Sequence, residues 1–142
     1  MTDSITDWLR AQLDEDERIA RWAVSEHERE PRLVKCETGG QWSRRYVDYG
    51  GTEVVDGAGH VIVPAAHDKG AAVRTHIAAH DPARVLREID AKRQIIEQHE
   101  RYAAERRRMM GGWDPRSDDS PVLAALASVY ADRPGYRDGR RP

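Results

Sequence analysis

His76 and His80 are the residues whose type and spacing point most directly to chemistry. They are four positions apart in a segment with helical spacing, so both imidazoles leave one side of the helix, as two ligands of one metal ion must. The segment lacks the glutamate of a zinc-protease motif. Further ligands would have to come from other parts of the chain, namely Asp16, Cys36, His67, Asp81 or His99. One hypothesis is therefore a transition-metal site, with zinc as the cofactor of a metal-dependent enzyme. The alternative is that both histidines bridge core and surface, one of them paired with Asp16.

Other catalytic patterns are absent from the sequence. There is no Gly-x-Ser-x-Gly nucleophile elbow, and the single Cys36 falls in a predicted strand without an activating neighbour. The paired glycines join strand to strand rather than strand to helix, unlike a phosphate-binding loop. The acidic run at residues 14–17 spreads around a helix, as in a solvated face. These observations favour a non-enzymatic protein that needs no cofactor.

Arginines suggest nucleic-acid binding as an alternative function. Arg84, Arg87 and Arg93 lie on the predicted long helix, while Arg44 and Arg45 alternate with aromatic residues in a predicted strand. Cations beside stacking surfaces suit a nucleic-acid strand, and the order helix, strands, helix is also that of the double-stranded RNA-binding domain. Against this, the first helix is acidic and the net charge is −2.

Protein binding is the function that the sequence favours most. The helix predicted to begin at Pro82 continues to Met110, well beyond the apolar stripe that would pack it onto its own core. Met109 and Met110 at its end, Trp113 and a short apolar C-terminal helix are suitable docking surfaces. They would serve a protein partner or close a homodimer.

Composition limits the other classes of function. The 142 residues suit one small domain with or without an appended helix, and 39% are hydrophobic with no phenylalanine. No apolar run approaches a membrane span, and the first residues do not form a signal peptide. A lone cysteine cannot form an internal disulfide. We therefore expect a cytoplasmic protein with a modest core and no membrane partner.

Elements that would position these residues follow from periodicity and turn signals. The first helix should start at Asp3 or Ser4 and end at Pro31, with Gln12 and Asp16 inside its apolar stripe. Such a carboxylate needs water or a partner, because burying it unpaired is costly. Antiparallel strands bounded by Gly-Gly or Asp-Gly turns are predicted at residues 32–36, 42–49, 52–55 and 60–63, the first being the weakest.

The remaining chain is predicted to be mostly helical. After a loop at residues 64–70, a short helix spans residues 71–80, Asp81 caps the long helix with Pro82 at its first position, and Ser120-Pro121 opens the C-terminal helix. The prediction is an α+β fold: an N-terminal helix, a three- to four-stranded antiparallel meander, a short helix plus a long helix, and an appended C-terminal helix. We expect a core domain at residues 1–110, a linker at 111–119, and a C-terminal helix and tail at 120–142.

Three stretches of the chain resemble a known family. They are Asp7-Trp-Leu-Arg-Ala-Gln-Leu-Asp-Glu-Asp-Glu17, the central block from His76 to Arg93, and Leu126-Ala-Ser-Val-Tyr130 with the residues through Tyr136. They are similar to a family of small uncharacterised proteins encoded by actinobacteria and their phages. That family tends to have His where Arg133 stands and Trp near Arg140. The resemblance implies a cytosolic, often phage- or prophage-borne protein and carries over no catalytic residue.

Overall fold

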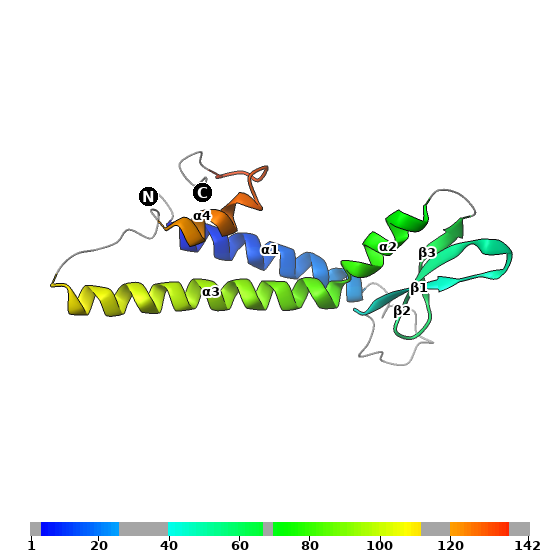
Figure 1. The fold of residues 1–142 in the computed structure, drawn as a ribbon, viewed down its shortest axis with the longest axis horizontal. Helices are drawn as coiled ribbons and strands as arrows, with labels where there is room; N and C mark the ends of the chain where they lie inside the picture. The colour runs from blue at the N-terminus through cyan, green and yellow to red at the C-terminus, as the bar shows by residue number, and fades with distance from the viewer. Residues whose placement is uncertain (1–3, 26–39, 67–69, 112–119, 137–142) are drawn as a thin grey trace. The chain divides into compact units, whose positions relative to one another are not determined.

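The computed structural model describes residues 4–25, 40–66, 70–111 and 120–136 (Figure 1). A helix is followed by a three-stranded antiparallel sheet and then by further helices, including a long one and a short C-terminal one, so the predicted α+β class is confirmed. The chain forms two compact units: unit 1 is Met1–Asp16 with Ile89–Pro142, and unit 2 is Glu17–Glu88. None of the described helices combines the length and the apolarity that crossing a membrane requires.

Helix α1 spans Ile5–Ser25 and begins where the capping signal predicts. The Ser4 hydroxyl accepts a hydrogen bond from the Asp7 N–H at 3.2 Å and donates one to the Asp7 carboxylate at 2.7 Å. This satisfies one of the N–H groups that a helix start leaves without an intrahelical partner, and it places an acid at the positive end of the helix dipole.

Unit 1 is a helical assembly of the start of α1, most of α3 (Pro82–Met109) and α4 (Pro121–Ser128). Its core takes one apolar stripe from each helix. The largest side chains exposed by less than 2% are Ile5, Leu9, Leu13, Ile89, Ile96 and Leu123. Burying each of them contributes about 1.5–3 kcal/mol of transfer free energy. Ser120 caps α4 by accepting the Leu123 N–H at 3.3 Å.

Unit 2 is built on the sheet, with strand order β1-β2-β3. Strands β1 (Trp42–Tyr46), β2 (Thr52–Asp56) and β3 (Val61–Ala66) pair antiparallel, and every residue of the central strand β2 is buried. A 3-10 turn, η2 (Asp48–Gly50), joins the first two strands. Helix α2 (Ala71–Ala79) contacts β1 and β2. The meander is therefore confirmed with three strands.

The bounds of β1 and β3 differ most from the prediction. The strand predicted at residues 42–49 ends at Tyr46, because the chain turns at η2. Strand β3 begins at Val61 and continues to Ala66, through Pro64, which we predicted to open a loop. Proline is tolerated there because β3 is an edge strand of the described sheet, where one side of the backbone needs no partner, and the β2–β3 register is irregular around it.

The turn between β2 and β3 is organised by Asp56. Its carboxylate accepts hydrogen bonds at 2.9 Å from the N–H groups of Ala58 and His60, and lies 3.0 Å from the His60 ring nitrogen Nδ1. Burial acts to raise the pKa of Asp56, but the hydrogen bonds from His60 and Ala58 outweigh it and hold the pKa below its ordinary value. The ionised carboxylate is thus part of the turn.

Several predicted features lie outside the described residues. These are the strand at residues 32–36, the helix end at Pro31, most of the linker at 111–119, and the side chains of Cys36, His67 and Trp113.

Candidate functional site

His76 and His80 lie together on α2, as their spacing predicts. Their ring centroids are 4.2 Å apart and both side chains are exposed. The His80 Nδ1 lies 2.9 Å from the His76 carbonyl oxygen, so this nitrogen is directed at the backbone. Within residues 4–25, 40–66, 70–111 and 120–136, no three His, Cys, Asp or Glu side chains form a group that could hold a metal ion. Asp81 instead caps α3, accepting the Arg84 N–H at 2.6 Å.

Asp16, the carboxylate that interrupts the apolar stripe of α1, has partners within unit 1. It accepts a hydrogen bond from the Tyr130 hydroxyl at 2.8 Å and another from the Arg133 guanidinium. The same guanidinium contacts Gln12 and lies over the Tyr130 ring, 4.7 Å from its centroid. Burial and the neighbouring Asp16 raise the pKa of Tyr130, which stays a neutral donor. We call these four residues the Asp16 cluster; it explains both polar residues in the stripe.

Trp8 holds the chain segment that follows α4 against α1. Its indole N–H donates to the Pro134 carbonyl at 3.1 Å, and its ring meets Tyr130 edge-on and Tyr136 at a tilt. Gly135 has a φ of +82°, and a Cβ there would lie 2.8 Å from the Trp8 nitrogen. Glycine is needed for both reasons. Sequence reasoning did not predict that Trp8 and Tyr130 pack together in this way. The one sequence feature that pointed to this region was Asp16, a carboxylate inside an apolar stripe that needed a partner.

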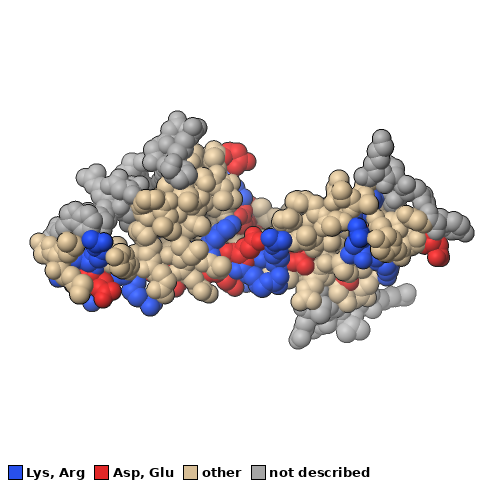
Figure 2. Space-filling model, viewed as in Figure 1, with Lys and Arg blue, Asp and Glu red and all other residues tan. Residues whose placement is uncertain are grey.

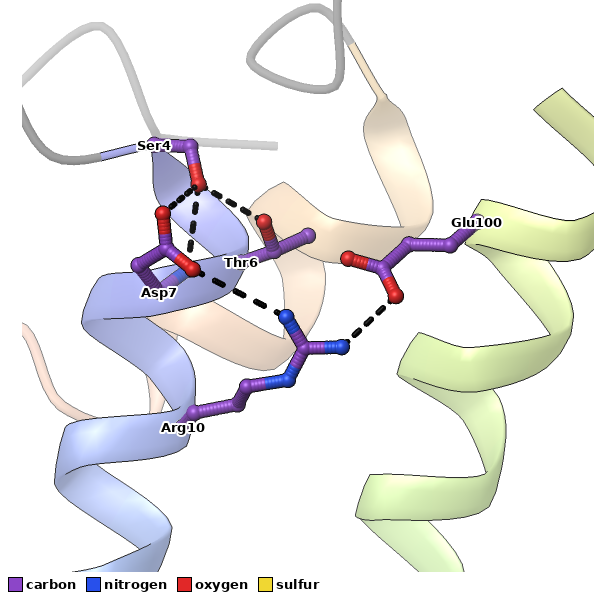
Figure 3. Close-up of polar contacts among 5 residues, drawn as sticks. All are labelled: Ser4, Thr6, Asp7, Arg10 and Glu100. Atoms are coloured by element: carbon purple, nitrogen blue, oxygen red, sulfur yellow. Dashed lines mark hydrogen bonds and ion pairs between the residues drawn. The ribbon is translucent and has the colours of Figure 1, made fainter. Parts of the chain in front are cut away.

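A polar network joins α1 to α3 near the start of the chain (Figure 3). Arg10 forms a 2.6 Å ion pair with Glu100 and a longer one, 3.7 Å, with Asp7. Ser4 bridges Asp7 and Thr6 through two 2.7 Å hydrogen bonds. The hydrogen bond to Glu100 raises the pKa of Arg10. Asp14, one turn after Arg10 on α1, forms a second ion pair with Arg93 of α3 at 2.6 Å.

These ion pairs flank a small hollow in unit 1 with a volume of about 140 Å³. It is lined by Arg10, Asp14, Arg93, Ile96 and Glu97. Sites for small-molecule ligands typically have about 300–1,000 Å³ and enclose most of the ligand. Arg10, Asp14 and Arg93 are already in ion pairs, and the described residues place no group of metal ligands there. The hollow has room for a few water molecules. The charged residues around it join α1 to α3 through ion pairs.

Most of the arginines proposed to bind nucleic acid are engaged with acids. Arg84 pairs with Glu88 at 2.8 Å, Arg93 pairs with Asp14, and Arg45 pairs with its cross-strand neighbour Glu53. Arg44 instead donates to the Thr75 and Tyr46 hydroxyls at 2.8 and 3.0 Å, and Arg87 is exposed. Figure 2 accordingly shows many basic side chains beside acidic ones on the face that it draws.

A second apolar stripe runs along α3, on the solvent side. Ile95, Tyr102 and Met109 are exposed by 42, 59 and 79%. They recur every seven residues, so they lie on one line of the helix about 21 Å long. The buried stripe of Ile89 and Ile96 is offset from it by one residue. We call Ile95, Tyr102 and Met109 the outer stripe. The sequence predicted that α3 outruns its core stripe, but not this second line.

Basic and aromatic groups border the outer stripe. Arg106 lies against Tyr102, 3.3 Å from the hydroxyl oxygen and 5.7 Å from the ring centroid, and contacts the Met110 sulfur at 3.5 Å. Between residues 101 and 108 the helix has four arginines and one glutamate. His99, half-buried beside the stripe, has a buried Nδ1 without a hydrogen-bond partner in the described part of the chain.

Together these features define an α+β protein in which charged links hold the helices and exposed apolar residues follow one face of a long helix. Residues 2–142 match the model of a family described as "Family of unknown function (DUF6221)", so the chain belongs to that family. No curated protein and no solved structure matches the chain.

Proposed function

We propose that the protein is a non-enzymatic binding module that contacts another protein through the outer stripe of α3. The observation that carries the proposal is the regular seven-residue spacing of three large, exposed side chains on a helix whose other stripe is buried. This is the pattern by which one helix packs against a second. The length of the stripe suits an interface at the small end of the usual range.

The charges beside the stripe define the partner's chemistry. The helix has an excess of arginine between residues 101 and 108, so the complementary surface is a helix with apolar residues at similar spacing and acidic residues beside them. A second copy of this chain and a different protein are the two sources of such a helix. The resemblance to proteins encoded by actinobacteria and their phages supports an accessory role in the bacterial cytoplasm.

The test compares a stripe variant with a matched control. The stripe variant is Ile95→Gln with Tyr102→Gln, which keeps the helix propensity but removes the apolar surface. The control is Val122→Gln, an exposed apolar residue of α4 in the same unit. Light scattering measures the mass against the 16.1 kDa of one chain, and retention of host proteins on the immobilised chain measures hetero-association.

Self-association predicts twice the chain mass for the wild type and the control, and one chain mass for the stripe variant. Hetero-association predicts a protein retained by wild type and control in equal amounts and lost from the stripe variant. The proposal is wrong when the stripe variant matches the wild type in both measurements.

Nucleic-acid binding is a second candidate because of Arg44. This arginine pairs with no acid in the described residues and lies 5.2 Å from the ring centroid of Tyr46, which is itself highly exposed. Cation and stacking surface together suit a single-stranded nucleic acid. Affinity for a labelled oligonucleotide should then fall with rising salt and weaken in Arg44→Gln, whereas Arg45→Gln, in an ion pair with Glu53, should matter less. Equal affinity in both variants would exclude this use of β1.

A further inference from the structure

The start of α2 has an unusual distribution of positive charge. The residue that caps it is Gly70, which has no side chain to accept the first N–H groups, and the first turn contains no acid. The first intrahelical hydrogen bond runs from the Arg74 N–H to the Gly70 carbonyl oxygen at 3.0 Å. The N–H groups of Ala71, Ala72 and Val73 therefore precede it and form the positive end of the helix dipole. All three residues are exposed, so solvent reaches this helix end.

The Arg74 side chain is directed back to this helix end. The residue is only 8% exposed, and its Nε donates to the Pro64 carbonyl on β3 at 3.3 Å. Its Nη1 is buried and has no hydrogen-bond partner in the described part of the chain. The guanidinium occupies the space that a side chain on Gly70 would fill, with its Cζ 3.1 Å and its Nη2 3.3 Å from the position of a Cβ. The guanidinium, a hydrogen-bond donor, thus lies where the side chain of an N-cap residue would normally supply an acceptor.

Two positive groups meet at this point, the guanidinium of Arg74 and the first N–H groups of α2. Arginine remains protonated, and leaving a buried charged donor unpaired costs free energy. Among the described residues of unit 2, Glu53 pairs with Arg45 and Asp56 organises its own turn. An anion at the helix end would accept from Arg74 and from the first-turn N–H groups at once, and would supply the missing cap.

We propose that the start of α2 together with Arg74 binds a phosphate group, either free or as the monoester of a small molecule. Gly70 makes the site by leaving room for the guanidinium. This site lies in unit 2 and is independent of the outer stripe in unit 1.

Amide NMR of the full chain tests the site, with inorganic phosphate as the probe and chloride at matched ionic strength as the reference. Saturable shifts are expected for the N–H groups of residues 71–73 and for the Arg74 Nε–H. Arg74→Gln should weaken phosphate binding by about tenfold or more, the loss of a charge-assisted hydrogen bond. Arg87→Gln, an exposed arginine of the same unit, should leave it unchanged. Glycerol phosphate binding more tightly than inorganic phosphate would identify the monoester as the preferred form.

A second variant tests the same site in case Arg74→Gln does not fold. Gly70→Ser supplies a capping hydroxyl and displaces the guanidinium, so it should fold and still lose phosphate affinity. The proposal is overturned if the first-turn amides show no saturable shift, or if Gly70→Ser and Arg74→Gln bind phosphate as the wild type does.

Discussion

Replacing Asp16 by alanine tests whether the Asp16 cluster is structural. The carboxylate accepts one hydrogen bond from a neutral hydroxyl and one from a guanidinium, and its side chain is 21% exposed against 30% for that of Arg133. Hydrogen bonds to charged groups contribute about 1.5–3 kcal/mol each, less where water reaches the pair. Removing both should lower the free energy of unfolding by about 2–3 kcal/mol, because the Tyr130 hydroxyl also loses its acceptor while buried.

Urea unfolding followed by far-ultraviolet circular dichroism measures this loss as a lower midpoint at unchanged slope. Asp14→Ala is the matched control on the same helix. Its partner is Arg93, but the Asp14 side chain is 69% exposed, so its loss should cost less than about 1 kcal/mol. A double-mutant cycle of Asp16→Ala with Arg133→Ala should give a coupling of about 1–2 kcal/mol.

Equal losses in Asp16→Ala and Asp14→Ala, or a coupling near zero, would refute this account. The metal hypothesis makes a different prediction for the same variant. If Asp16 were a ligand beside His76 and His80, its replacement would lower the bound zinc and leave the unfolding of metal-free protein unchanged.

Three further variants test local features by urea unfolding. Asp56→Asn should cost about 1–2 kcal/mol at pH 7. The pKa of Asp56 is lower in the folded than in the unfolded state, so its contribution to the free energy of unfolding is present above the unfolded pKa and is lost as pH falls through the folded pKa. The stabilities of wild type and variant should therefore converge below about pH 4. A constant difference down to about pH 3 would contradict this. Gly135→Ala should cost about 1–2 kcal/mol, since it combines a positive φ with a contact on Trp8, and an unchanged midpoint would argue against that packing. Ser120→Ala should cost about 1 kcal/mol by removing the α4 cap, whereas Ser120→Asp should retain most of it.

Local signals in the sequence were sufficient to predict most of the fold. The Ser4 cap and the Asp81-Pro82 start of α3 place helix ends because their chemistry acts within a few residues. Asp-Gly and Gly-Gly turns separate β2 from its neighbours in the same way. The error at Pro64 arose because proline opposes a strand only where its missing N–H is needed, and edge position is a property of the whole sheet.

Partners of individual polar residues could not be read from the sequence. Asp16 needed a partner, and the spacing of α2 offered His76 and His80. The partners in the structure, Tyr130 and Arg133, lie more than a hundred residues away along the chain. Pairings of that separation depend on how helices pack rather than on any local pattern. The seven-residue spacing of Ile95, Tyr102 and Met109 is visible in the sequence. The sequence does not show, however, whether such a stripe is buried or faces solvent.

Among the described residues, the polar side chains with structural roles differ from those at the two proposed binding sites in having partners. Where the chain buries or half-buries a charge for its own stability, the charge has partners: Asp16 with Tyr130 and Arg133, and Asp56 with its turn. Two buried side-chain nitrogens lack a partner within these residues, Arg74 Nη1 and His99 Nδ1. The first lies at the start of α2 and the second borders the outer stripe. Leaving such a buried polar atom unpaired costs about 1–3 kcal/mol. A phosphate at the proposed α2 site would recover that free energy for Arg74, and a partner helix on the outer stripe would recover it for His99 if it forms a hydrogen bond with Nδ1.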